Sequence, residues 1–440
     1  MNIGSVIKYY RTKNSMTQLQ LADGICSISH LSKIESNAYV PHESTIEALL
    51  AKMGVHWQKE VERHKRLQRQ LGEFIDSSLH YDLENMRKLY HQLKLENDYI
   101  QSTELVNQYE LYKFRYYIYE IDQPQAERQK NMLERLTGSF SAPEKWLYKF
   151  FLSIYYSMLN KTEQSLDCLE MLDQGIQSIP QKFEGEFYYQ KARLMIVLDR
   201  FEVSAYYAEL AVQFYQLHHN YIRLMHAQLL LAINYTRRNL HVQASGLYEV
   251  LKRNARLTGQ TELFHQTSYN YIELLKVTGE YGKAYDFLRD LKNSLPEDSY
   301  FYKAVLLSKI EAAIESGIDA SHLIREVRAL LQQSPDEQVA IYCNYFEKRN
   351  FSQPDLMSYC ETIMFPFFRK NGYIKESKKI AVDLVNYYQQ QKEWKKRIST
   401  AHTIIAMEGN FYENRQKNCC CCSYRCSFGR RYRAIGRNRS

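Results

Sequence analysis

Residues 28–33 carry the side chains best suited to recognition chemistry in the N-terminal part of the chain. On a helical wheel, Leu31 and Ile34 point to one side, as buried positions do. The positions left facing outward are Ile28, Ser29, His30, Ser32 and Lys33. Hydroxyl, imidazole and ammonium groups at the start of a helix can reach base edges in the major groove of DNA. This short stretch therefore predicts a DNA-contacting surface.

A second set of residues suits the binding of an extended peptide. The backbone of such a peptide has unpaired N–H and C=O groups, and one asparagine side chain can satisfy both. The asparagines expected on the first helices of helical hairpins are Asn234, Asn270 and Asn344. Arg193 and Arg223 could pair with a peptide carboxylate. Each could equally be an ordinary polar position, and most of the 37 tyrosines are expected to pack between helices.

The sequence lacks the patterns of the common catalytic sites. It contains no phosphate-binding P-loop, no H-E-x-x-H zinc pair and no G-x-S-x-G nucleophile turn. Residues 419–422 are four adjacent cysteines, and Cys426 follows, in a tail without histidine. Adjacent side chains point in different directions, which disfavours a closed tetrahedral metal site. We therefore expect a binding protein with no catalytic activity, no metal and no cofactor.

The DNA-contacting surface belongs to a unit of four short helices expected within residues 1–56. Thr17 can cap the second helix and Gly24 can end it, while Ser27 can cap the third and Pro41 follows in a loop. The apolar positions of the other three helices are Ile3, Val6, Ile7, Tyr10, Leu19, Leu21, Ala22, Ile46, Leu49, Leu50 and Met53. Short helices joined by short turns are typical of a helix-turn-helix domain.

The remainder of the chain is expected to be a linker helix over 57–71 and a repeat array over 72–409. A turn recurs at Thr162, Phe201, Leu240 and Tyr281, with spacings of 39, 39 and 41 residues, and again at Ile318 after 37. A small residue follows each turn: Ser165, Ser204, Ala244, Ala284 and Ser321. Two-helix units of about this length with a small residue at the helix crossing are typical of tetratricopeptide repeats. The pattern predicts an all-α protein with a right-handed tetratricopeptide-like solenoid, and an irregular helical domain is the alternative.

Composition supports the all-α prediction and separates a C-terminal tail. Only 16 glycines and 8 prolines occur in 440 residues, too few for the turns of a β-sandwich or barrel. The net charge of +8 comes entirely from eight Lys and Arg residues within 415–440, so it is no evidence of DNA binding. We expect residues 410–440 to be an atypical, disordered and non-native end, with a genuine basic tail as the alternative. Four scattered cysteines and no signal peptide or apolar span predict a cytoplasmic protein.

The N-terminal strings IKYYR, TQLQLADG, LSKIES and TIEALLAKMGV resemble the Xre or phage-repressor family of helix-turn-helix domains. The resemblance implies a structural salt bridge between Arg11 and Glu35. It also implies a Gln18 amide directed at a DNA phosphate, and Ser27 beside the reading helix. The turn glycine stands one place earlier than in the family pattern. The alternative is a protein-interaction module, because residues 1–56 carry only five Lys and Arg against four acids.

Together with the repeat array, this domain resembles the RRNPP family of peptide-pheromone receptors. The string ADGICSISHLSKIE is similar to the NprR and PlcR branch, with the phage arbitrium receptors as more distant relatives. The resemblance implies a cytoplasmic transcription regulator that binds a DNA operator and a short quorum-sensing peptide. Because one domain of such low charge would hold DNA weakly, we also expect a homodimer or higher oligomer. The resemblance also implies two alternatives: a Rap-like protein that binds a sporulation phosphorelay response regulator, or a phage lysis–lysogeny peptide receptor.

Overall fold

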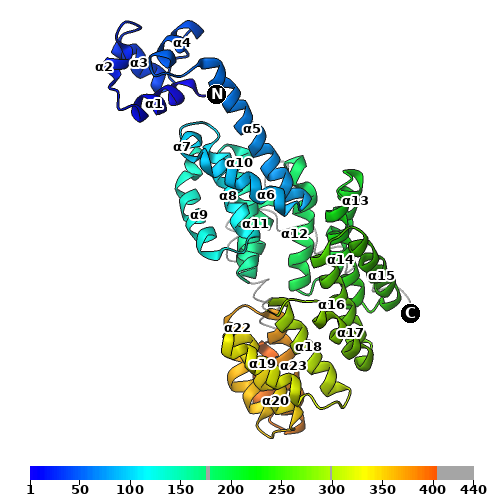
Figure 1. Cartoon of the computed structure of the whole chain (residues 1–440). Helices are drawn as coiled ribbons and strands as arrows, with labels where there is room; N and C mark the ends of the chain where they lie inside the picture. Colours follow the sequence, from blue (N-terminus) through cyan, green and yellow to red (C-terminus); the bar gives the residue numbers. More distant parts are fainter. Residues whose placement is uncertain (175–178, 298–299, 404–440) are drawn as a thin grey trace, which may run out of the picture. The chain divides into compact units, whose positions relative to one another are not determined.

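The computed structural model describes residues 1–174, 179–297 and 300–403, and within these ranges every regular element is helical (Figure 1). The all-α prediction is therefore confirmed. The chain divides into two compact units, Met1–Ile318 and Asp319–Ser440. No helix in the described ranges is both long and apolar enough to cross a membrane.

The N-terminal domain contains four helices: α1 (Ile3–Lys13), α2 (Gln18–Ala22), α3 (Ile28–Glu35) and α4 (Glu43–Lys52). Thr17 caps α2 in a capping box with Gln20, and the Ser27 hydroxyl accepts the His30 N–H at the start of α3. Both predicted caps are confirmed. Leu19 was expected among the apolar inward positions, but its side chain is 63% exposed because α2 turns only its Leu21 and Ala22 side toward the core.

The helix predicted for 57–71 does not end there. Helix α5 (Trp57–His80) is 24 residues long and is buried at Leu67, Leu71, Phe74 and Ile75. Apolar residues at helical spacing continue beyond Leu71, so the helix gains burial by extending into the repeat array. It is therefore not an exposed linker but one continuous helix that starts at the N-terminal domain and ends inside the array.

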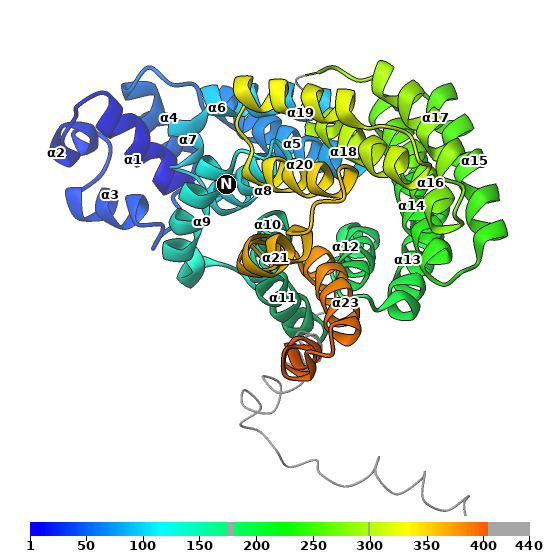
Figure 2. The same cartoon turned by 90° about the horizontal axis from the view of Figure 1, so that it is seen from below.

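The rest of the first unit is built mainly of antiparallel helical hairpins. Its helices are α6 (Leu83–Leu95), α7 (Asn97–Ile100), α8 (Val106–Tyr119), α9 (Gln123–Leu136), η1 (Thr137–Ser139), α10 (Ala142–Met158), α11 (Thr162–Gln174), η2 (Gln181–Phe183), α12 (Glu184–Val197), α13 (Phe201–Leu217), α14 (Tyr221–Arg237), α15 (His241–Leu257), α16 (Thr261–Val277), α17 (Tyr281–Asn293) and α18 (Tyr300–Glu315). Helices α10, α12, α14 and α16 pack on one another in sequence. Figure 2 shows α12, α14 and α16 on the inner side of the first unit, with α13, α15 and α17 outside them.

The predicted small residues lie where the two helices of a hairpin cross. Ser165, Ser204, Ala244 and Ala284 are all almost completely buried. The Ser165 hydroxyl donates to the Ser153 carbonyl, and the Ser204 hydroxyl donates to the Ala192 carbonyl, both at 2.8 Å. In each case the acceptor lies twelve residues earlier in the chain. A larger side chain at these positions would force the two helices apart. The recurring crossing confirms the tetratricopeptide-like repeat.

The second unit contains α19 (Ser321–Gln333), α20 (Glu337–Asn350), α21 (Leu356–Tyr359), η3 (Cys360–Met364), α22 (Phe365–Lys370), α23 (Ile374–Gln390) and a further helical stretch at 394–403. The expected small residue Ser321 is instead half-buried at the first position of α19, and Ile324 takes the buried place three residues on. The turn at Ile318 is thus a weaker copy of the repeat than its spacing suggested. The predicted tail at 410–440 lies outside the described residues.

Candidate DNA-reading and peptide-binding sites

The helix-turn-helix core is held together around one buried carboxylate, that of Glu35. The Arg11 guanidinium donates to it through Nε at 2.5 Å and Nη2 at 2.9 Å, which raises the pKa of Arg11. The predicted salt bridge is therefore present. The Gln18 side-chain N–H donates to the same carboxylate at 2.8 Å. One N–H of the Gln18 amide is therefore held by Glu35, and the side chain is half-buried.

Helix α3 buries one side and leaves the other open. Leu31 and Ile34 are fully buried, as the wheel predicted. Ser29, Ser32 and Lys33 are exposed, and Ile28 is 45% exposed. His30 is half-buried, and its ring lies edge-on against Tyr39 with centroids 4.9 Å apart. Ser27 uses its hydroxyl as the helix cap. Of the seven predicted DNA-contacting residues, Gln18 and His30 are half-buried and the other five are exposed: Ser27 at the cap of α3, and Ile28, Ser29, Ser32 and Lys33 on α3 itself.

The helix-turn-helix domain is fastened to the start of α5 by a polar cluster. The Tyr10 hydroxyl donates to Glu60 at 2.7 Å and accepts from Arg63 at 2.7 Å. Arg63 also pairs with Glu96 and lies over the buried Tyr99 ring, 3.9 Å from its centroid. Burial and the neighbouring Glu60 raise the pKa of Tyr10, so the hydroxyl stays protonated and able to donate. These contacts join α1, α5 and the α6–α7 junction.

The predicted peptide-binding residues differ in accessibility. Arg193 on α12 is exposed and donates to Gln190 at 3.0 Å. Asn270 on α16 is half-buried, and its side-chain N–H donates to the Gln266 carbonyl one turn back. Asn344 in the second unit is half-buried and accepts from Arg328 at 3.2 Å. These three residues keep part of their surface open to a ligand.

The other two predicted peptide-binding residues are enclosed. Asn234 has no exposed surface, and its N–H groups donate to Ser204 and to the Leu230 carbonyl at 2.9 Å each. Arg223 is 3% exposed and forms an ion pair with Glu186. The structure therefore does not place Asn234 or Arg223 where a peptide could contact them. Both side chains point into helix–helix contacts, a distinction that a polar residue on a first helix does not reveal in sequence.

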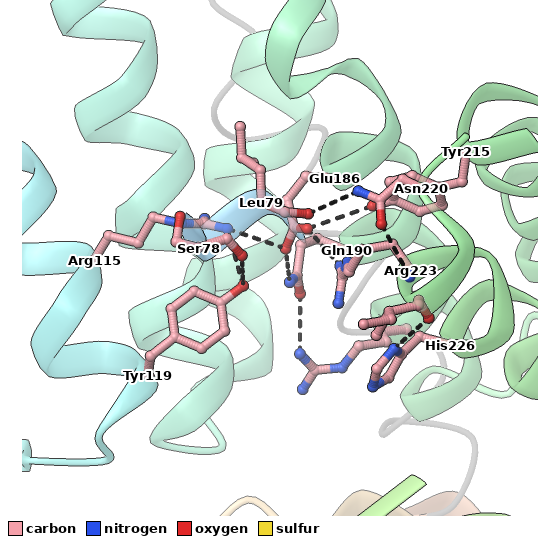
Figure 3. A network of polar contacts seen from close by, with 12 residues as sticks. Ser78, Leu79, Arg115, Tyr119, Glu186, Gln190, Tyr215, Asn220, Arg223 and His226 are labelled. Atoms are coloured by element: carbon pink, nitrogen blue, oxygen red, sulfur yellow. Dashed lines mark hydrogen bonds and ion pairs between the residues drawn. The ribbon is translucent and has the colours of Figure 1, made fainter. Parts of the chain in front are cut away.

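Arg223 belongs to a larger buried group, here called the Glu186 network (Figure 3). Besides Arg223, the Glu186 carboxylate accepts from Gln190 at 2.9 Å and lies 3.7 Å from Arg115. Burial alone would raise the pKa of Glu186, but Arg223 and Arg115 hold it below its usual value. Gln190 in turn accepts from the exposed Arg193, so the network reaches the surface of α12.

The same network holds the C-terminal end of α5. Asn220 caps α14 and donates to the Leu79 carbonyl at 3.0 Å, across 141 residues of sequence. Arg115 donates to the Ser78 hydroxyl at 2.8 Å, and Tyr119 donates to the Ser78 carbonyl at 3.2 Å. Helix α5 is therefore hydrogen-bonded to the helix-turn-helix domain at one end and to α8 and α14 at the other.

Sequence reasoning missed this role for Glu186, Arg115 and Asn220. The available signal was a charged residue inside each of two aromatic-rich helical segments, YELYKFRYYIY and GEFYYQKARL. A charge in such a segment is costly to bury alone, so it implies a partner of opposite charge elsewhere in the fold. The identity of that partner depends on contacts distant in sequence. No group of three His, Cys, Asp or Glu side chains within the described part of the chain is arranged to hold a metal ion.

Comparison with known proteins agrees with both parts of the structure. Residues 7–59 match the helix-turn-helix family. The chain is 24% identical over 391 residues to the transcriptional activator NprA of Geobacillus stearothermophilus. This alignment covers 85% of this chain and 95% of NprA. The structure of NprR in complex with its cognate peptide NprX superposes with a TM-score of 0.63 at 18% identity, over 78% of this chain and 98% of NprR. The chain is thus similar to receptors of the RRNPP type in its helix-turn-helix domain and in the fold of its array.

The fold of the helical array also resembles that of a Rap protein. A Rap protein complexed with Competence and Sporulation Factor superposes with a TM-score of 0.67 at 12% identity, over 79% of this chain and 98% of the Rap chain. At this identity the likeness concerns the fold. The chain thus combines a helix-turn-helix domain with a helical array of the kind seen in both NprR and Rap structures.

Proposed function

We propose that this protein is a peptide receptor of the RRNPP type, a DNA-binding transcription regulator controlled by a short signalling peptide bound in its helical array. The observation that carries the proposal is the open α3 surface of Ile28, Ser29, Ser32 and Lys33 in a domain fastened to an NprR-like array. NprA is named a transcriptional activator, and the NprR structure holds its cognate peptide. Neither relative is named as an enzyme, and we propose no catalytic activity, metal or cofactor for this chain.

The way α5 is held supports a route for this control. Helices of a repeat array contact mainly their neighbours, so small rotations at several interfaces change the path of the array. A peptide that binds one arrangement more tightly than another shifts the population toward it. Because α5 is hydrogen-bonded to α8 and α14 at Ser78 and Leu79, such a rotation moves this helix. The helix-turn-helix domain, fastened at Glu60 and Arg63, then moves with it.

The proposal includes an assembly and a location. One helix-turn-helix domain with so few basic residues has little electrostatic affinity for DNA, so we propose a homodimer or higher oligomer that binds half-sites spaced in steps of about 10–10.5 base pairs. Because it acts on DNA, we propose a cytoplasmic protein. Gln18 and His30 keep their proposed places among the DNA contacts, and in this structure one Gln18 N–H is bound to Glu35 while the His30 ring lies against Tyr39.

The DNA-reading part of the proposal is tested by replacing both Ser29 and Lys33 with alanine. Binding to a duplex selected from a random pool by the full chain should weaken by up to several kcal/mol, since each base contact is worth about 1–3 kcal/mol. Fluorescence anisotropy measures the affinity, and circular dichroism checks that helicity is unchanged. Lys94→Ala, an exposed lysine of α6, is the matched control and should bind normally. Unchanged affinity of the double variant would show that α3 is not the reading helix.

The peptide-binding part is tested at Arg193 and Asn270, the two predicted contacts with open surface in the first unit. Arg193→Ala should weaken the binding of a peptide chosen from a pentapeptide-to-octapeptide library, as should Asn270→Ala. Losing one hydrogen bond costs about 1–3 kcal/mol, or roughly 5- to 150-fold in affinity. Calorimetric titration gives the constants. Arg253→Ala on the outer helix α15 is the matched arginine control. If both variants bind like the parent, the peptide lies elsewhere, and Asn344 in the second unit becomes the next candidate.

A second candidate function comes from the Rap-like array, whose TM-score to this chain exceeds that of the NprR complex. In that case the array binds a sporulation phosphorelay response regulator and the DNA-reading domain is secondary. Pull-down of a phosphorelay response regulator by a protein that shifts no DNA fragment would favour it. A phage lysis–lysogeny receptor shares the proposed chemistry and differs only in the genes that its operator controls.

A further inference from the structure

The open surface of α3 contains one apolar side chain among polar ones. Ile28 is the first residue of the helix and is 45% exposed, whereas the apolar residues Leu31 and Ile34 are fully buried. Ser29 directly follows Ile28 in the sequence, and Ser32 lies one turn further along the helix from Ile28. The isoleucine therefore stands at the end of the helix that enters the groove, beside the residues proposed to contact bases.

The polar residues around Ile28 already make contacts within the domain. Ser27 is occupied as the helix cap, His30 lies against Tyr39, and Gln18 is bound to Glu35. Ile28 keeps 45% of its surface exposed beside them. If α3 lies in the major groove with its N-terminal residues toward the bases, Ile28 faces the edges of base pairs.

The chemistry of those edges selects its partner. The major groove presents hydrogen-bond donors and acceptors on every base pair, and its distinctive apolar group is the C5-methyl of thymine. Isoleucine against N7, O6 or N4 would remove water from a polar group and supply no hydrogen bond in return. Against a thymine methyl, both apolar groups are removed from contact with water, which is favourable. We infer that Ile28 reads a thymine C5-methyl group in each half-site, an inference that rests on the proposed DNA-binding function.

Deoxyuridine provides the test, because it differs from thymidine only in lacking this methyl. The probe is a duplex selected by the full chain from a random pool, with its thymines replaced one at a time by deoxyuridine. One thymine in each half-site should be sensitive: removing its methyl should weaken binding about fourfold, and about fifteenfold when both half-sites are changed. A cytosine placed at that position should bind weakly, and 5-methylcytosine should recover part of the loss.

The variants assign the effect to the side chain. Ile28→Ala should bind thymine and deoxyuridine duplexes equally, and Ile28→Val should keep part of the discrimination. Leu19→Ala, a more exposed leucine on α2, is the control and should discriminate like the parent. The inference is overturned if no thymine of a selected duplex is sensitive, or if Ile28→Ala still discriminates. Failure to select any duplex would overturn the proposed function together with it, and this outcome differs from selection without methyl sensitivity.

Discussion

Glu186→Ala is expected to lower the free energy of unfolding by about 3–5 kcal/mol, the usual effect of removing one partner of a buried ion pair. Glu186 and Arg223 are both almost completely buried, and Arg115 lies 3.7 Å from the same carboxylate. Without Glu186, two guanidinium groups remain inside the first unit with no carboxylate between them. Glu186→Gln keeps the shape of the side chain and isolates the loss of charge.

Urea unfolding of the full chain, followed by Trp146 fluorescence and circular dichroism, measures this effect. Trp146 is buried against Phe187, the residue next to Glu186, and replacing Trp57 and Trp394 by phenylalanine in every protein compared makes the emission specific to this region. The control is Glu209→Ala, an exposed glutamate on α13 that should change stability little. If Glu186→Ala lowers the free energy of unfolding no more than the control does, the guanidinium groups of Arg115 and Arg223 do not need the Glu186 carboxylate. A peptide-dependent change in this cost would connect the Glu186 network to ligand binding.

Acidification is expected to destabilise the protein through His226, which lies one turn along α14 from Arg223. Burial and the nearby Arg223 lower the pKa of His226 to about 4, against 6.5 for an exposed histidine. As the pH falls below about 6.5, the unfolded chain binds a proton at this position and the folded chain does not. The contribution of His226 to the free energy of unfolding is therefore fully present above that pH. It is lost as the pH falls toward 4, by roughly 3 kcal/mol in total.

The measurement compares urea unfolding of the parent and of His226→Gln at pH 7 and pH 4.5. The variant should lose less stability than the parent between the two pH values. Glu186 also contributes less to the stability of the protein on acidification, because its folded-state pKa is lowered. This loss is common to the parent and the variant. His91→Gln, an exposed histidine of α6, should behave like the parent. Equal pH dependence of the parent and His226→Gln would show that His226 takes up a proton as readily in the folded protein as in the unfolded chain.

Features that depend on neighbouring residues could be predicted from the sequence. The caps Thr17 and Ser27, the buried side of α3 and the small residues at the hairpin crossings all follow from spacing within one helix or one hairpin. The Arg11–Glu35 salt bridge was implied by the family resemblance and is present. These features are set by helical periodicity and capping chemistry, which act over a few residues and leave a clear pattern.

Only the tertiary structure decided which polar side chains stay open to a ligand. Asn234 and Asn270 look alike in sequence, yet one is enclosed against Ser204 and the other is half-open. The burial of Arg223 depends on Glu186, 37 residues away, and the end of α5 is held by Asn220, 141 residues away. A repeat period places a residue on one face of its own helix. It does not state which distant helix covers that face, because this depends on how successive hairpins pack, and that packing determines whether a charge meets water, a ligand or a buried partner.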